Sequence, residues 1–257
     1  MKPINPKEIQ DTLTAFVKNT CEDAGFSKIV FGLSGGVDSA TSFLLAVRAL
    51  GPANVFPVLM PYGALSTQST IDAMMLVEKS GVPIGNITRI DIKQATDALI
   101  SIGGAAFENV RRGNIMARVR MTALFDQAKR RQALVLGTEN KSEHLLGYFT
   151  RFGDEASDIE PLFGLYKTQV YELAKTLGVT DTILNKPPSA ELWFDQTDEK
   201  ELGFTYKDAD EILSLLYDEK KTVDKVVAAG FDKTLVEKVK LRVDQNMFKQ
   251  KLPVINN

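Results

Sequence analysis

The segment Lys28–Leu45, KIVFGLSGGVDSATSFLL, constrains the fold of this chain more than any other. Its apolar run, Ile29–Leu33, ends in a serine and two glycines, after which apolar residues recur at helical spacing. This order predicts a buried strand, a tight turn and a helix, an arrangement that places an anion at a helix N-terminus. Because glycine has no Cβ, such a turn can adopt positive φ and bring backbone N–H groups close to a phosphate.

Polar side chains in the same turn add to this phosphate chemistry. Ser34 and Ser39 supply hydroxyl donors, and Asp38 places a carboxylate beside the expected phosphates. Because a bare carboxylate repels phosphate, Asp38 predicts a bridging cation, for which Mg²⁺ is the best candidate. Neither a P-loop, GxxxxGK[ST], nor a GxGxxG after the first strand is present in the sequence. The alternative for this segment is an ordinary serine-capped helix that follows a strand.

Composition limits the other kinds of chemistry. The net charge of −2 argues against bulk nucleic-acid binding by charge alone. The one cysteine, Cys21, rules out an internal disulfide or a Cys-based zinc cluster, and the one histidine, His144, leaves little room for a His-rich metal site. The chain opens without an apolar signal core, and no stretch approaches the ~20 apolar residues of a membrane span. We therefore expect a reduced, soluble, cytoplasmic protein without a membrane partner.

Alternating strands and helices predict an α/β fold. Further strands are expected at Asn54–Met60, Asn86–Ile92 and Ala133–Gly137. Helices are expected at Pro6–Gly25, from Val37 to about Leu50, at Thr67–Ser80, up to about Ile102, and at Glu108–Gln132. Such βαβ units predict a Rossmann-like, doubly wound, mostly parallel sheet, with ligands at the carboxyl ends of the strands. After a loop at Asn185–Gly203, three helices in Thr205–Leu252 are expected to form a C-terminal helical layer on the same domain.

A second group of polar residues follows the fourth predicted strand. Glu139 and Glu143 are four residues apart, so we expect both on one face of a helix, where a glutamate and Asp38 could hold one Mg²⁺. Lys167 is expected near the start of a helix that begins around Leu165. A cation is unfavourable at that end of the helix dipole, which is understandable if the lysine points at a phosphate.

Several motifs together resemble a known family. SGGVDS resembles the pyrophosphate-binding signature of the N-type ATP pyrophosphatases, which split ATP between the α- and β-phosphates. MPYGALSTQSTIDA, GNIMARVRM, GTENKSEHLLGYFTRFGD, PLFGLYK and KPPSAEL follow it in the order and spacing of the ammonia-dependent NAD synthetases, from about Phe31 to Tyr206. GMP synthetases and tRNA-thiolation enzymes share the first motif but lack the later ones.

This resemblance implies a set of ATP and metal contacts. The turn that would hold the ATP phosphates comprises Gly32, Leu33, Ser34, Gly35, Gly36, Val37, Asp38 and Ser39. Mg²⁺ is expected on Asp38 and Glu143. Further ATP contacts are expected at Thr138, Lys167 and Ser189, where the family usually has Thr at the last position. Asp38, Asp154 and Lys167 are the expected catalytic residues.

The resemblance also implies contacts to the substrate deamido-NAD, which is nicotinate adenine dinucleotide. These are expected at Arg118, Arg151, Asp158 and Lys249, with Arg151 in place of the usual Lys. Many relatives carry His-Lys-Arg near the C-terminus, whereas this chain has Phe248-Lys249-Gln250, which leaves Lys249 as the candidate there.

The implied reaction is the amidation of deamido-NAD. The substrate carboxylate attacks the ATP α-phosphate, pyrophosphate leaves, and ammonia displaces AMP from the mixed anhydride to give NAD. Asp154 is expected to take up the ammonia proton. One domain spanning 1–257 leaves no length for a glutaminase, so free ammonia is the expected nitrogen donor. The apolar positions of Glu108–Gln132 exceed one core face and predict a homodimer.

Other functions remain open at this point. A non-catalytic ATP sensor would use the same turn, and another ATP pyrophosphatase could act on a different acid or on tRNA, although no basic run favours tRNA. Some residues have simpler interpretations. His144 and Cys21 are expected to be packed helix residues, and Arg111 and Arg112 a solvated helix face. Trp193 and Phe194 would cover a ligand or anchor a lid. The simpler interpretation of Glu139 is that it only caps its helix or places a negative charge at the helix N-terminus.

Overall fold

Four parallel strands form the centre of the structure, a computed structural model that describes residues 1–103 and 108–251. They are β1 (Ile29–Gly32), β2 (Val55–Leu59), β3 (Thr88–Arg89) and β4 (Leu134–Val135), in the order β3-β2-β1-β4. β1 is central, because Ile29 pairs with Val55 on one side and with Leu134 on the other. The predicted parallel sheet is confirmed.

The third and fourth strands are shorter than predicted. Asn86 belongs to a 3₁₀ turn, Ile84–Asn86, and its side-chain amide donates to the Ala53 carbonyl at 3.0 Å. Beyond β3, Ile90 still donates to Leu59 of β2, but β3 has no neighbour on its outer side to extend the ladder. After β4, Leu136 still donates to the Val30 carbonyl of β1 and forms an isolated parallel bridge to Ile159 on its other side. The regular ladder is therefore short at both edges of the described sheet, although single hydrogen bonds continue beyond it.

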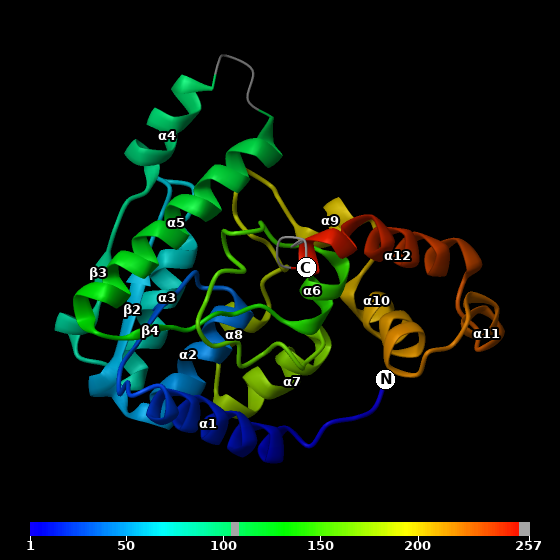
Figure 1. The fold of residues 1–257 in the computed structure, drawn as a ribbon, viewed down its shortest axis with the longest axis horizontal. Helices are drawn as coiled ribbons and strands as arrows, with labels where there is room; N and C mark the ends of the chain where they lie inside the picture. The colour runs from blue at the N-terminus through cyan, green and yellow to red at the C-terminus, as the bar shows by residue number, and fades with distance from the viewer. Residues whose placement is uncertain (104–107, 252–257) are drawn as a thin grey trace, which may run out of the picture.

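Helices cover both faces of the sheet (Figure 1). One face carries α1 (Pro6–Asp23), α2 (Val37–Leu50), α3 (Thr67–Ser80) and α7 (Lys167–Leu177). The other carries α5 (Asn109–Arg131), against which α4 (Lys93–Ile102) packs. Side-chain alternation along β1 explains this, because Phe31 enters the first core whereas Val30 enters the second. The doubly wound arrangement is confirmed.

The C-terminal part of the chain forms a separate helical layer. Its helices are α10 (Tyr206–Leu213), α11 (Val223–Ala228) and α12 (Lys233–Asn246), which enclose their own hydrophobic cluster. The three predicted helices are confirmed. A π-helical turn, Ser214–Asp218, extends α10, and a 3₁₀ turn, Met247–Gln250, follows α12. The predicted end of this region, Leu252, lies outside the described residues.

Three short helices lie between β4 and α10 in the described chain: α6 (Lys141–Leu146), α8 (Asp181–Leu184) and α9 (Asp198–Leu202). α9 falls within the segment predicted as loop, Asn185–Gly203. It forms because the Thr197 side chain accepts a hydrogen bond from the Lys200 N–H and Gly203 closes the helix at a φ of +71°. None of the described helices is long and apolar enough to cross a bilayer.

The strand order also places the ligand-binding edge. From β1 the chain proceeds to β2 and β3 on one side and then returns to β4 on the other side of β1. The direction of winding therefore reverses between β1 and β4, and open α/β sheets bind ligands at such a switch point. The turn after β1 and the segment after β4 both open there.

Candidate functional site

The turn between β1 and α2 is held together by its own serines. The hydroxyls of Ser34 and Ser39 lie 3.0 Å apart, and Ser39 donates to the Gly36 carbonyl at 3.0 Å. Gly36 is the N-cap of α2, and no side chain caps the helix. The alternative of a serine-capped helix is therefore wrong. The first N–H groups of α2 lack a side-chain acceptor, as an anion site requires.

Gly35 is required by the geometry of this turn. Its φ is +83°, in the left-handed region, and a Cβ at this position would lie 2.3 Å from the Ser69 carbonyl oxygen. Ser69 belongs to α3, so the turn packs directly against the backbone of the next helix. A side chain at position 35 would separate the two elements.

Lys167 connects two carboxylates at the centre of the site. Its Nζ lies 2.6 Å from Asp38 Oδ2 and 2.8 Å from Glu143 Oε1, and the residue is 3% exposed. Asn140 donates from Nδ2 to the other oxygen of Asp38 at 2.9 Å. Lys167 is the first residue of α7, and Asp38 stands in the first turn of α2. The positive ends of α2 and α7 therefore converge on one point, which favours an anion between them.

Carboxyl groups outnumber cations in this cluster. A third carboxylate, Asp198, is 3% exposed, and its Oδ1 has no hydrogen-bond partner among the described residues. Burial raises the pKa of Glu143 and of Asp198, and the charge of Lys167 opposes both shifts. Burial alone would lower the pKa of Lys167, but Asp38 and Glu143 outweigh it and raise that pKa. Lys167 thus stays charged among an excess of carboxylates, a setting that suits a further cation.

A cavity of about 390 Å³ opens beside this cluster. All eight residues of the predicted phosphate turn, 32–39, line it. Four further predicted contacts line it as well: Thr138, Lys167, Ser189 and Lys249. Lys249 is oriented by the carbonyls of Gly147 and Phe149, at 2.7 and 3.0 Å from its Nζ. All of the predicted ATP contacts therefore share one cavity.

Asp154 also lines the cavity, and it is exposed to solvent. Its Oδ1 accepts a hydrogen bond from the Thr150 N–H at 2.9 Å. Desolvation by the surrounding protein raises the pKa of Asp154, and that backbone hydrogen bond opposes the shift. A carboxylate of raised pKa that faces a cavity can accept a proton from a bound group.

Three predicted substrate contacts do not line the cavity. Arg118 donates to the Arg151 carbonyl at 3.1 Å, and Arg151 donates to the Lys251 carbonyl at 2.7 Å. Asp158 accepts from the Val135 N–H at 2.7 Å and so ties its loop to β4. The structure brings the two arginines together but leaves Asp158 at the sheet. Their role as deamido-NAD contacts stays a prediction.

One pairing predicted from spacing is wrong. Glu139 and Glu143 do not share a helix face, because α6 begins at Lys141 with Asn140 as its N-cap. Asn140 and Glu143 form a reciprocal capping box, which fixes the first helical residue two positions beyond Glu139. Glu139 instead lies buried, with its Oε1 3.2 Å from His144 Nδ1. Of the two glutamates, Glu143 is the one that shares the Lys167 ammonium with Asp38.

Two of the simpler interpretations, those for His144 and Cys21, are confirmed. The His144 ring packs between the rings of Phe149 and Phe163, with centroids 5.9 and 4.4 Å away. Cys21 is fully buried, and desolvation raises the pKa of its thiol to about 11, so it stays protonated. Trp193 lines the cavity, whereas Phe194 is 82% exposed.

Three described cations that line the cavity, Arg120, Lys186 and Arg242, were not predicted from the sequence. The guanidinium of Arg120 lies beside Asp154 and donates to the Met60 carbonyl at 3.1 Å. Lys186 forms an ion pair with the buried Asp72 and donates to Ser69 Oγ at 2.9 Å. The available signal for Lys186 was its place directly before the Pro-Pro pair of KPPSAEL.

The chain is similar along nearly its whole length to known proteins. A family model described as NAD synthase matches residues 9–253. The NH3-dependent NAD+ synthetase of Chlorobium phaeobacteroides is 43% identical over 253 residues, which cover 98% of this chain and 90% of the relative. Among solved structures, the NMN synthetase from Francisella tularensis has a TM-score of 0.87 at 35% identity, covering 99% of this chain and all of that one. The NH3-dependent NAD synthetase from Campylobacter jejuni has a TM-score of 0.83 at 32% identity, with the same coverage.

Proposed function

The chain belongs to the NAD synthase family, and from this premise we propose that it amidates deamido-NAD to NAD. The enzyme is a ligase that uses ATP and ammonia and releases AMP and pyrophosphate. The observation that carries the proposal is the junction of Lys167 with Asp38 and Glu143 beside the uncapped start of α2. A nucleotide sensor would need the anion site, but it would not need a buried lysine shared by two carboxylates.

The first step joins two anions, so charge neutralisation is its main requirement. A carboxylate oxygen of deamido-NAD attacks the ATP α-phosphorus, and the bond to pyrophosphate breaks. The N–H groups of the 32–39 turn and the start of α2 hold the phosphates, while Lys167 offsets the charge that develops. Thr138 and Ser189 line the same cavity, and we propose both as ATP contacts. The Ser189 hydroxyl donates to the Gln196 carbonyl at 2.8 Å in this structure, so it would have to exchange that bond for one to ATP.

Mg²⁺ fits the donors present at this site. Asp38 and Glu143 both reach within 2.8 Å of one point, the Lys167 Nζ, and Mg²⁺ prefers such hard oxygen ligands together with phosphate oxygens and water. We propose that these two carboxylates hold it. When bound, Mg²⁺ would neutralise phosphate charge. Lys167 would then turn from the carboxylates toward the phosphates.

The second step forms the C–N bond. Ammonia attacks the acyl carbon of the mixed anhydride, and AMP leaves with the former carboxylate oxygen. The nitrogen must lose a proton during this attack, and Asp154 is placed at the cavity wall to accept it. We propose Lys249, Arg118, Arg151 and Asp158 as the deamido-NAD contacts.

The remaining assignments concern the whole chain. We propose that residues 1–257 form a single domain, and that ammonia itself is the nitrogen donor, as the names of the NH3-dependent relatives indicate. We further propose a homodimer. Since ATP and dinucleotides are intracellular metabolites, we place the enzyme in the cytoplasm.

A second candidate substrate is nicotinate mononucleotide, because a structural neighbour at 35% identity is described as an NMN synthetase. The same carboxylate chemistry would apply to it. Purified protein should therefore be given ATP, Mg²⁺ and ammonium with either nucleotide, beside a glutamine-only control. We expect NAD and AMP in equal amounts from deamido-NAD with ammonium. Product from the mononucleotide alone would overturn the dinucleotide assignment.

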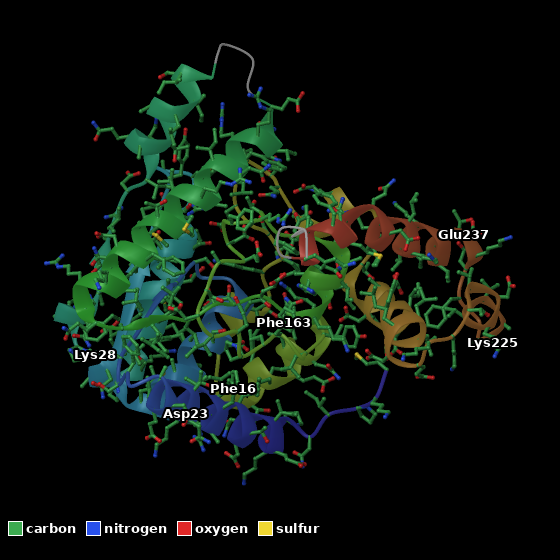
Figure 2. The ribbon with its side chains drawn as sticks, in the orientation of Figure 1. Phe16, Asp23, Lys28, Phe163, Lys225 and Glu237 are labelled. Atoms are coloured by element: carbon green, nitrogen blue, oxygen red, sulfur yellow. The ribbon has the colours of Figure 1, made fainter. Side chains whose placement is uncertain are left out.

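Asp38→Asn offers a direct check of the site in the same assay. It should abolish Mg²⁺-dependent pyrophosphate release while the fold is kept. The matched control is Asp23→Asn, at the exposed end of α1 on the outside of the molecule (Figure 2). Unchanged release in Asp38→Asn would remove this carboxylate from the mechanism.

A further inference from the structure

The C-terminal helical layer contacts the start of α7, the helix that begins with Lys167. Asp210 of α10 is fully buried, and its Oδ2 accepts from the Thr168 N–H at 2.8 Å and from the Thr168 hydroxyl at 2.7 Å. Its Oδ1 accepts from the hydroxyl of Ser142, in α6. The same Ser142 oxygen accepts from the Lys167 N–H at 2.8 Å. The helices α6, α7 and α10 contact one another in pairs.

These contacts replace a helix cap. The N-cap residue of α7 is Tyr166, whose hydroxyl is directed to Asp218 at 2.9 Å. The first two N–H groups of α7, on Lys167 and Thr168, are bound instead by Ser142 and Asp210 from other elements. A carboxylate at this end of the helix also offsets the unfavourable placement of Lys167 in its first turn.

We propose that Asp210 is a positioning residue that acts on the reaction through Lys167. Its carboxylate and the Ser142 hydroxyl fix the backbone from which the Lys167 side chain reaches Asp38 and Glu143. Ser142 also precedes Glu143 directly, so the same bonds fix two members of the central cluster. The helical layer thereby sets the geometry of a site that is built on the sheet. This inference rests on the role proposed for Lys167.

Steady-state kinetics on variants would test the proposal. Asp210→Ala should lower kcat on the order of 10²-fold, the effect of a displaced catalytic group, by more than it raises the KM for ATP. Asp210→Asn keeps an acceptor for Thr168 and should recover part of the loss. Asp208→Asn is the matched control, since Asp208 lies in the same helix but is exposed. It should match the wild type.

A double-mutant comparison separates positioning from general stability. In a Lys167→Met background, Asp210→Asn should lower residual activity no further, because it acts through the missing lysine. A purely structural role would give the same fold-loss in both backgrounds, and that result would overturn the proposal. If the Asp210 variants do not fold, Ser142→Ala, which removes one hydroxyl, tests the positioning role in their place. A folded Ser142→Ala with wild-type kcat would contradict the inference.

A separate readout distinguishes failure of this inference from failure of the proposed function. If the wild type makes no NAD, the proposed function fails, and ATP binding measured by calorimetry tests the positioning role instead. Asp210→Ala and Ser142→Ala should then weaken ATP binding, and Asp208→Asn should not. Equal affinity in all of them would refute the positioning role.

Discussion

At the scale of single residues, Lys167 separates two carboxylates that would otherwise face each other. Removal of one partner from a buried ionic cluster typically costs about 3–5 kcal/mol, because the remaining charges are left unpaired. We therefore expect Lys167→Met to lower the free energy of unfolding by about that amount. Loss of one preorganised cation at the reacting phosphates should also lower kcat by roughly 10²–10³-fold. Denaturant unfolding and pyrophosphate release measure the two effects.

The matched control is Lys240→Met on α12, where the lysine pairs with Asp244 and both side chains are about half exposed. An exposed pair contributes within about 1 kcal/mol, so this variant should unfold and react like the wild type. A Lys167→Met protein as stable as Lys240→Met would show that the two carboxylates do not depend on the lysine.

Glu160 predicts a pH dependence of stability. Burial raises its pKa from 4.5 to about 8, although it accepts hydrogen bonds from the Ser157 hydroxyl and the Glu139 N–H. Between these two values the folded state binds the proton and the unfolded state does not, so stability falls as pH rises through the window. In Glu160→Gln this titration is absent. The melting temperature of the wild type should fall relative to the variant from pH 4.5 to about pH 8.

The control for this series is Glu237→Gln, which changes an exposed glutamate of α12 (Figure 2). Its melting curve should run parallel to that of the wild type over the same pH range. Parallel curves for Glu160→Gln as well would show that Glu160 titrates normally in the folded protein.

At the scale of elements, the turn after β1 depends on Gly35. Gly35→Ala would force a Cβ into the Ser69 carbonyl and hold a non-glycine residue at positive φ. We expect a loss of stability of roughly 1–3 kcal/mol together with weaker ATP binding. Gly36→Ala is the comparison, because its nearest contact would be the Ser34 hydroxyl at an ordinary 3.4 Å. It should unfold like the wild type, as thermal melts would check, and equal stability of the two variants would contradict the account.

Local patterns explain which elements could be predicted. The strand, turn and helix at Ile29–Leu50 are encoded by neighbouring residues, so the sequence predicted both their order and the cavity-lining turn. The third strand was predicted too long, because β3 lies at an edge of the described sheet and pairs on one side only. The helix α9 was predicted as loop, because its formation depends on one capping threonine. Periodicity also placed Glu139 on a helix whose cap excludes it.

The site residues likewise divide into those predicted from local motifs and those that depend on contacts distant in the sequence. Asp38 and Lys167 were predicted because each stands in a motif with a chemical reason for its place. Arg120, Lys186 and Asp210 function through partners far away in the sequence, such as Lys186 with Asp72. No local pattern marks an arginine that turns inward to a cavity. Contacts of this kind follow only from how the elements pack.

At the scale of the whole molecule, α5 bears on the proposed homodimer. Part of its apolar surplus lines the cavity, through Val110, Met121 and Leu124, while Phe125 remains 37% exposed. We expect light scattering to give twice the single-chain mass of 28.3 kDa. Phe125→Asp should shift this toward the monomer, whereas Phe16→Asp, on α1 across the sheet, should not (Figure 2). A monomer for the wild type would contradict the proposal.

The central claim is that the site activates a carboxylate by adenylation, and oxygen labelling tests it most directly. Deamido-NAD carrying ¹⁸O at both oxygens of its nicotinate carboxylate would be turned over with ATP, Mg²⁺ and ammonium, and the AMP analysed by mass spectrometry. The account predicts one ¹⁸O atom in each AMP formed, because that oxygen leaves with the α-phosphorus. AMP without label, formed alongside NAD, would mean that the carboxylate never attacked the α-phosphate.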